Sequence, residues 1–193
     1  MKVTPSIRIL IALCLSLFSL QSFSTPYPWH QQLKKPHHIL MMRHADAPGY
    51  SDPTGFDLKN CATQRNLGEK GRQQAREIGE WLKTNGVSHA RILSSPWCRC
   101  QDTAKLLNLG SVQTEHSLGS FFENRSAESK QMHQLRQKIQ AELMYSKERP
   151  LILVTHQVNI QAFTGISVSS GQMVLVEVSS DGQYKSHQII TRD

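Results

Sequence analysis

Residues 38–44 have the sequence His-Ile-Leu-Met-Met-Arg-His. The unbroken apolar run from Ile39 to Met42 predicts a buried strand, which ends directly at Arg43 and His44. A second apolar run, Leu151-Ile-Leu-Val, follows Pro150 and ends just before His156. Two predicted strands therefore end in side chains that can carry chemistry.

Predicted helices alternate with these strands. Apolar or small residues recur at steps of four, three and four, the spacing of one helix face, at Gly71, Ala75, Ile78 and Leu82. The next predicted elements are a strand over 91–93, a turn at Ser94-Ser95-Pro96 and a helix over 97–108. They are followed by an amphipathic helix over 132–143 and by two final strands over 173–178 and 184–190. Residues 47–61, with two prolines and two glycines, predict a loop. The alternation indicates an α/β fold with a largely parallel sheet, in which ligands bind beyond the carboxyl ends of the strands.

The composition is that of an ordinary globular protein. The chain has 193 residues, of which 38% are hydrophobic, and this length suits one domain. Its net charge of +7 suits anionic ligands. Lysines and arginines are scattered rather than clustered, so nucleic acid is not an expected partner.

The N-terminus predicts export. Lys2 and Arg8 precede an apolar run from Ile9 to Phe18, and small and polar residues follow up to Ser24, as in a secretory signal peptide. The run is shorter than the ~20 residues that span a bilayer, so we expect cleavage and no stable membrane insertion afterwards, a retained anchor being the alternative. The expected organisation is a signal peptide over 1–24, an extended lead-in over 25–36 and one domain over 37–193, in the periplasm or secreted.

The residues at the strand ends suit phosphoryl chemistry. The arginine guanidinium binds phosphate oxygens through a planar fork. A neutral imidazole is a nucleophile able to form a covalent intermediate, and nearby arginine charge favours the neutral form. Arg43, His44, Arg99 and His156 therefore form a coherent candidate site.

Four motifs in order resemble the histidine phosphatase superfamily, which includes phosphoglycerate mutases. Met42-Arg43-His44-Ala45 resembles its Arg-His-Gly signature, with alanine for glycine, and 67–75 is similar to its Leu-Thr-x-x-Gly-x-x-Gln-Ala helix start. Residues 94–104 resemble its Ser-Ser-Pro-x-x-Arg-x-x-x-Thr-Ala, and 153–156 its late strand-His element. The resemblance implies a phosphoglycerate mutase-like three-layer α/β/α sandwich and no metal or other cofactor. It casts His44 as the nucleophile and Arg43, Arg99 and His156 as the phosphate pocket.

The resemblance does not identify the general acid. Superfamily members often place a Glu where this chain has Ser120, so Glu123 and Asp46 are the candidates, with no dedicated acid as a third alternative. Glu123 is favoured because Arg43 keeps Asp46 ionised, and we expect Phe121 and Phe122 to shield Glu123 from water. Arg65 lies just before the first predicted helix, where the superfamily often contributes a substrate-side residue, so it is a candidate phosphate or substrate contact, with an exposed turn charge as the alternative. Asp46 is a second substrate-side candidate.

Export and the resemblance together predict a disulfide. The family fold brings Cys61 near the helix start that holds Cys98 and Cys100, whereas positions two apart on one helix pair poorly. We therefore predict a bond from Cys61 to Cys98 or Cys100, with three free thiols as the alternative. The Cys-x-Cys spacing is a poor zinc site, and His37-His38 is at most an adventitious metal candidate.

These observations predict an exported phosphomonoesterase that acts on small or cell-envelope phosphates through a phosphohistidine on His44. The alternatives are a catalytically weak module that binds a phosphate ligand or a partner, and a protein phosphohistidine phosphatase.

Overall fold

The computed structural model describes residues 28–145 and 150–192. The predicted signal peptide therefore lies outside the described residues. The helices are α1 (Trp29–Gln32), α2 (Glu69–Thr84), α3 (Cys98–Leu106), α4 (Glu128–Tyr145) and α5 (Gln157–Thr164). The strands are β1 (His38–Arg43), β2 (Arg91–Ser94), β3 (Val112–Thr114), β4 (Leu151–Thr155), β5 (Met173–Val178) and β6 (Tyr184–Ile190), and short 3₁₀ turns lie at Cys61–Thr63, His116–Leu118 and Arg125–Ala127.

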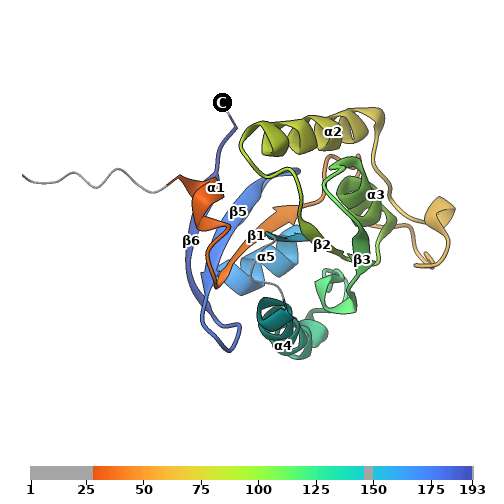
Figure 1. The fold of residues 1–193 in the computed structure, drawn as a ribbon. Helices are drawn as coiled ribbons and strands as arrows, with labels where there is room; N and C mark the ends of the chain where they lie inside the picture. Colours follow the sequence, from red (N-terminus) through yellow and green to blue (C-terminus); the bar gives the residue numbers. More distant parts are fainter. Residues whose placement is uncertain (1–27, 146–149, 193) are drawn as a thin grey trace, which may run out of the picture.

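The strands form one mixed sheet in the order β3-β2-β4-β1-β5-β6 (Figure 1). The pairs β2–β3, β2–β4 and β1–β4 are parallel, whereas β5 and β6 run antiparallel at one end. The predicted α/β fold with a largely parallel sheet is confirmed. The carboxyl ends of β1, β2 and β4 lie at one edge of the sheet, because parallel neighbours point the same way.

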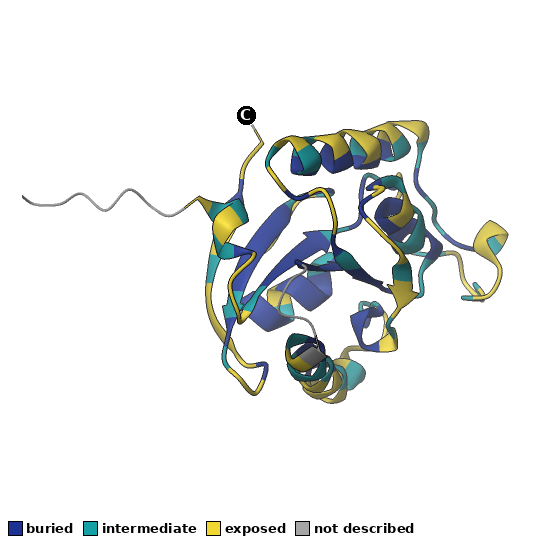
Figure 2. Ribbon diagram, viewed as in Figure 1, coloured by how far each residue is buried: buried dark blue, intermediate teal, exposed yellow. Residues whose placement is uncertain are grey.

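Helices cover both faces of the sheet, as β1 illustrates. Leu40 and Met42 join the core cluster that contains side chains of α2 and α3, and Ile39 and Met41 join the cluster under α4 and α5. Alternate residues of a strand point to opposite faces, so an apolar run on both faces needs two helical layers. Figure 2 shows the buried central strands, the mostly buried α5, and α2 and α4 exposed along their outer sides.

Three elements differ from the sequence-based expectation. The lead-in contains a single helical turn, α1, because Trp29 stacks on Trp81 of α2 with ring centroids 5.2 Å apart. β3 has three residues and is mostly exposed, so it lacks a strand pattern. α5 was not predicted, because its buried residues Val158, Ile160 and Phe163 do not repeat at one helical period.

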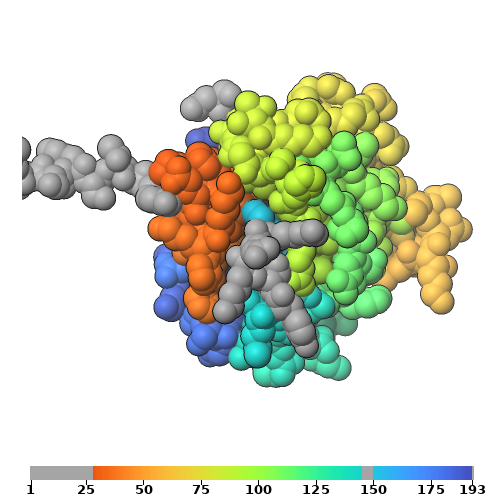
Figure 3. Space-filling model, in the orientation of Figure 1, coloured from red at the N-terminus to blue at the C-terminus, as the bar shows by residue number. Residues whose placement is uncertain are grey.

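The segment between β1 and α2 is the predicted loop. It stands out from the side of the molecule in the space-filling view, drawn in gold and orange (Figure 3). Its first residues are held tightly, since a Cβ added at Gly71 of α2 would lie 1.9 Å from the carbonyl oxygen of Asp46. Gly71 thus lets α2 lie directly against the backbone that follows His44.

Candidate active site

The ends of β1 and β4 and the start of α3 meet at one cavity of about 890 Å³. Its wall includes the four residues singled out at the strand ends, Arg43, His44, Arg99 and His156. Arg65, which precedes α2, lines the same cavity. The structure therefore brings together side chains that are up to 113 positions apart in the sequence, from Arg43 to His156.

His44 is held as a neutral ring. Its Nδ1 lies 2.8 Å from the carbonyl oxygen of Ala45, and a carbonyl can only accept, so Nδ1 carries the proton. Burial and the charges of Arg99, Arg43 and Arg65 together lower the pKa of His44 to about 3, although the hydrogen bond to Ala45 opposes them. The neutral tautomer leaves the lone pair on Nε2, the atom a phosphoryl acceptor needs.

The backbone around His44 is fixed by two helices. Thr103 of α3 accepts the N–H of Ala45 on its hydroxyl oxygen at 3.0 Å. Gln74 of α2 accepts the N–H of Asp46 through Oε1 at 2.9 Å. The turn that carries the imidazole is therefore preorganised, which favours reaction at a defined position.

His156 faces His44, with ring centroids 5.5 Å apart and planes at 70°. Its Nε2 lies 2.8 Å from the Ser95 hydroxyl, and its Nδ1 lies 3.5 Å from Nη2 of Arg99. Burial and then the charge of Arg99 lower the pKa of His156 well below its usual value. Two neutral imidazoles thus lie side by side among cationic side chains.

Each of the three arginines in the cavity wall donates a hydrogen bond from Nη1 and leaves Nε unpaired within the described residues. Nη1 of Arg43 donates to the carbonyl of Val168 at 2.9 Å, and Nη1 of Arg65 donates to the carbonyl of Ala47. Nη1 of Arg99 donates to a carboxylate. The Nε atom of each of these arginines is buried without a hydrogen-bond partner in the described part of the chain. Buried unpaired donors are costly, and each of these guanidinium groups keeps an unused hydrogen-bonding group. The three positive charges that line the cavity suit an anion.

The carboxylate that Arg99 contacts belongs to Asp52, which the sequence analysis did not identify. Asp52 accepts from Nη1 of Arg99 at 2.8 and 3.1 Å, from the indole N–H of Trp97 at 3.0 Å and from the backbone N–H of Arg65 at 2.9 Å. The bonds from Arg99 hold the pKa of this carboxyl below its usual range despite burial. Asp52 lies in an irregular loop 47 positions from Arg99, where no sequence pattern signals the pairing.

Both candidate acids line the cavity. Asp46 is half-buried and follows His44 by two positions, and Glu123 is exposed. Phe121 is buried in the core and Phe122 is half-buried, so the pair anchors this loop, but the expectation that they shield Glu123 from water is wrong. Ser120 also lines the cavity and accepts the N–H of Phe122 at 3.2 Å.

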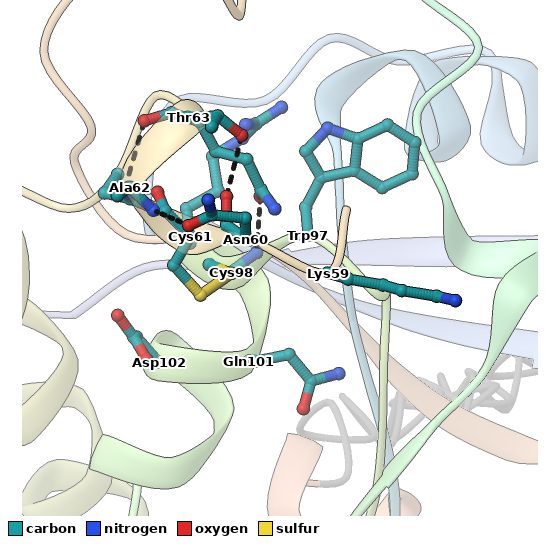
Figure 4. Close-up of a disulfide and its surroundings, with 12 residues drawn as sticks. Lys59, Asn60, Cys61, Ala62, Thr63, Trp97, Cys98, Gln101 and Asp102 are labelled. Carbon is teal, nitrogen blue, oxygen red and sulfur yellow. Dashed lines mark hydrogen bonds between the residues drawn. A yellow bond between two sulfur atoms is a disulfide. The ribbon is translucent and has the colours of Figure 1, made fainter. Parts of the chain in front are cut away.

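The predicted disulfide is present as Cys61–Cys98, with Cα atoms 5.7 Å apart. Figure 4 shows it joining the short turn at 61–63 to the first turn of α3, next to Trp97. Cys100 is a buried free thiol whose Sγ lies 3.6 Å from the carbonyl of Thr155, and burial raises its pKa to about 12. The bond therefore fixes the loop to the residue next to Arg99.

The outer wall of the cavity is aromatic. Tyr50 contacts Phe122 edge to face with centroids 5.3 Å apart, and Phe56 lies 5.9 Å from Trp97. All four residues line the cavity, and Tyr50 is 81% exposed. The cavity thus combines a polar, cationic floor with an apolar rim.

Within residues 28–145 and 150–192, no three His, Cys, Asp or Glu side chains gather in a group that could hold a metal ion. No helix in that same portion of the chain is long and apolar enough to cross a bilayer.

Comparison with known proteins agrees with this geometry. Residues 39–119 match the family model of the histidine phosphatase superfamily (branch 1). A serine/threonine-protein phosphatase, mitochondrial Pgam5 of Drosophila grimshawi, is 28% identical over 74 residues. That alignment covers 38% of this chain, and the chain spans only 23% of the length of that relative.

Solved structures share the fold over most of their length. The protein histidine phosphatase SixA in complex with tungstate superposes with a TM-score of 0.56 at 18% identity, over 79% of this chain and 96% of that one. A mycobacterial glucosyl-3-phosphoglycerate phosphatase superposes with a TM-score of 0.55 at 16% identity, over 80% and 97%. At these identities the structures establish a shared fold, and the matched motifs supply the link to the superfamily.

Proposed function

As a member of the histidine phosphatase superfamily, this chain is, we propose, an exported phosphomonoesterase that works through a phosphohistidine on His44. One observation carries the proposal. The Nδ1–H of His44 donates to the carbonyl of Ala45, which leaves Nε2 unprotonated beside three arginines whose Nε atoms have no partner among the described residues.

The first step transfers a phosphoryl group to His44. The Nε2 lone pair attacks phosphorus, an N–P bond forms, and the bond between phosphorus and the alcohol oxygen breaks with that oxygen taking the electron pair. In the second step water attacks phosphorus and gives a proton to the carboxylate that acted as the acid in the first step. The P–N bond breaks, its electron pair returns to Nε2, and inorganic phosphate leaves. No redox partner is required for either step.

The arginines stabilise charge on the transferring group, and His156 positions one of them. The guanidinium groups of Arg43, Arg65 and Arg99 line the cavity and donate to the phosphoryl oxygens, where charge-assisted hydrogen bonds are strongest. Nη2 of Arg99 can only donate, so Nδ1 of His156 accepts from it and the ring proton lies on Nε2, which donates to the Ser95 hydroxyl. His156 thereby holds Arg99 in place beside His44.

The leaving oxygen takes its proton from Glu123 or Asp46. Both line the cavity, and Glu123 is on a loop that Phe121 anchors in the core. The charge of Asp46 opposes the lowering of the pKa of Arg43, so this carboxylate acts on a phosphate-binding side chain. We therefore assign the acid role to Glu123.

Size and lining of the cavity favour an ester whose alcohol portion fills space beyond the phosphate. The aromatic rim of Tyr50, Phe56, Trp97 and Phe122 supports a ring-bearing or otherwise apolar group there. Export is supported by the Cys61–Cys98 disulfide and by the order of basic, apolar and small residues over 1–24. Small or cell-envelope phosphate esters are the proposed substrates.

A panel of phosphate esters assayed with the purified protein tests this function. We expect release of inorganic phosphate that His44→Ala abolishes, while His89→Ala, at an exposed position outside the cavity, retains it. Binding of phosphate without turnover of any ester would contradict the proposal and favour a phosphate-binding module. Turnover confined to phosphorylated histidine proteins would favour a protein phosphohistidine phosphatase.

A further inference from the structure

Asp52 is the acid in the cavity that forms an ion pair with one of its arginines. The side chains of Asp52 and Arg99 are 7% and 4% exposed, and the carboxylate contacts a single nitrogen, Nη1, with both oxygens. Asp46 and Glu123 also line the cavity, but neither forms a salt bridge with Arg43, Arg65 or Arg99 in the described residues.

This pairing changes the charge that the cavity floor presents. Arg43, Arg65 and Arg99 carry three positive charges, and the adjacent carboxylate cancels one of them. Asp46 also lines the cavity, and the net positive charge that is left suits one phosphoryl group better than two. The contact also occupies Nη1 alone, and Nε of Arg99 has no hydrogen-bond partner among the described residues.

Building on the phosphatase function proposed above, we propose that Asp52 is a specificity-determining residue that matches the cavity to a single phosphoryl dianion. It does so by neutralising one of the three arginine charges through its ion pair with Arg99. Ligands with a second phosphoryl group gain too little from the remaining positive charge to be preferred.

The test compares binding of orthophosphate and pyrophosphate, at a mildly alkaline pH where both are highly charged, to the wild type and to Asp52→Asn. The substitution keeps an oxygen for the N–H of Arg65 but removes the negative charge. We expect the preference for pyrophosphate over orthophosphate to rise by roughly tenfold, because pyrophosphate carries more negative charge near the newly uncompensated Arg99. Asp57→Asn is the matched control, since Asp57 is exposed in the same loop and does not line the cavity.

The ratio of the pyrophosphate affinity to the orthophosphate affinity separates charge matching from a role of Asp52 that only holds Arg99 in place. Loss of support weakens both ligands equally and leaves the ratio unchanged, and that result would overturn the proposal. If Asp52→Asn does not fold, the wild type still decides: pyrophosphate binding more than about tenfold tighter than orthophosphate excludes charge matching to a dianion. Failure of the wild type to bind either anion would instead refute the phosphatase function itself.

Discussion

The backbone carbonyl of Arg65 accepts a hydrogen bond from Nη1 of Arg99 at 3.2 Å. One arginine thus positions the other, although Arg65 belongs to a loop and Arg99 to α3. The Cys61–Cys98 bond joins the same two segments a few residues away. The cationic floor of the cavity is therefore a single unit built from the loop before α2 and the first turn of α3.

Arg65 is expected to bind phosphate together with Arg99. Arg65→Gln should weaken binding of vanadate or phosphate by roughly tenfold to a hundredfold, since a charge-assisted hydrogen bond contributes ~1.5–3 kcal/mol. Inhibition constants measured by competition provide the readout. Arg76→Gln, on the exposed face of α2, is the control, and equal affinities for the two variants would remove Arg65 from the site.

Loss of the disulfide should destabilise the whole domain. Cys61 and Cys98 are 37 positions apart, and the chain-entropy relation gives ~3–4 kcal/mol for a loop of that size. Denaturant unfolding of the double variant Cys61→Ser, Cys98→Ser should show this loss. A reducing agent should bring the wild type to the same midpoint and leave the variant unchanged, whereas a wild type indifferent to reduction contradicts the bond.

Acid should destabilise the fold before it protonates the nucleophile. The folded-state pKa of His44 is about 3 and that of His156 is also depressed, so the unfolded chain, with histidine pKa near ~6.5, binds more protons as pH falls below that value. The free energy of unfolding should therefore decrease as pH falls from ~6.5 toward 4, by up to ~1.4 kcal/mol per pH unit for each ring. His44→Gln should remove about one ring's share of this slope, and exposed His89→Gln should not. An identical slope in His44→Gln means that the ring is not held neutral.

The proton donor can be identified by varying the leaving group. An aryl phosphate needs little proton transfer, whereas an alkyl phosphate gains ~10²–10⁴-fold from a positioned acid. We expect Glu123→Gln to spare aryl turnover and to reduce alkyl turnover within that range. Asp46→Asn is the matched variant on the same cavity. If only Asp46→Asn loses alkyl turnover selectively, the acid is Asp46. If each variant loses a little turnover, equally for the aryl and the alkyl phosphate, no dedicated acid operates.

The framework of the site was predictable because it lies at the ends of strands. Arg43 and His44 follow one apolar run and His156 follows another, and parallel pairing of β1 with β4 brings the ends of those runs together. The disulfide could be narrowed to two pairs. Cys98 forms the bond because the side chain of Cys100 is on the buried side of α3, where its Sγ contacts the carbonyl of Thr155 in β4.

Asp52 and the shape of the cavity rim were not predictable from the sequence. Asp52 acquires its role only through a contact with Arg99 across an irregular loop, and loops follow no apolar period. For the same reason the exposure of Glu123 could not be inferred from the two phenylalanines before it. α5 was missed because burial on most sides leaves no polar face to mark a helix.

The central claim is that His44 carries the phosphoryl group, and rapid-quench labelling tests it most directly. A short reaction with ³²P-labelled ester, stopped in base, should trap a phosphoenzyme that survives alkali, is lost in acid and maps to His44. The same label should be absent from His44→Ala and present in exposed His89→Ala. A label of equal intensity in His44→Ala, or turnover with no labelled protein at any time, would contradict the account.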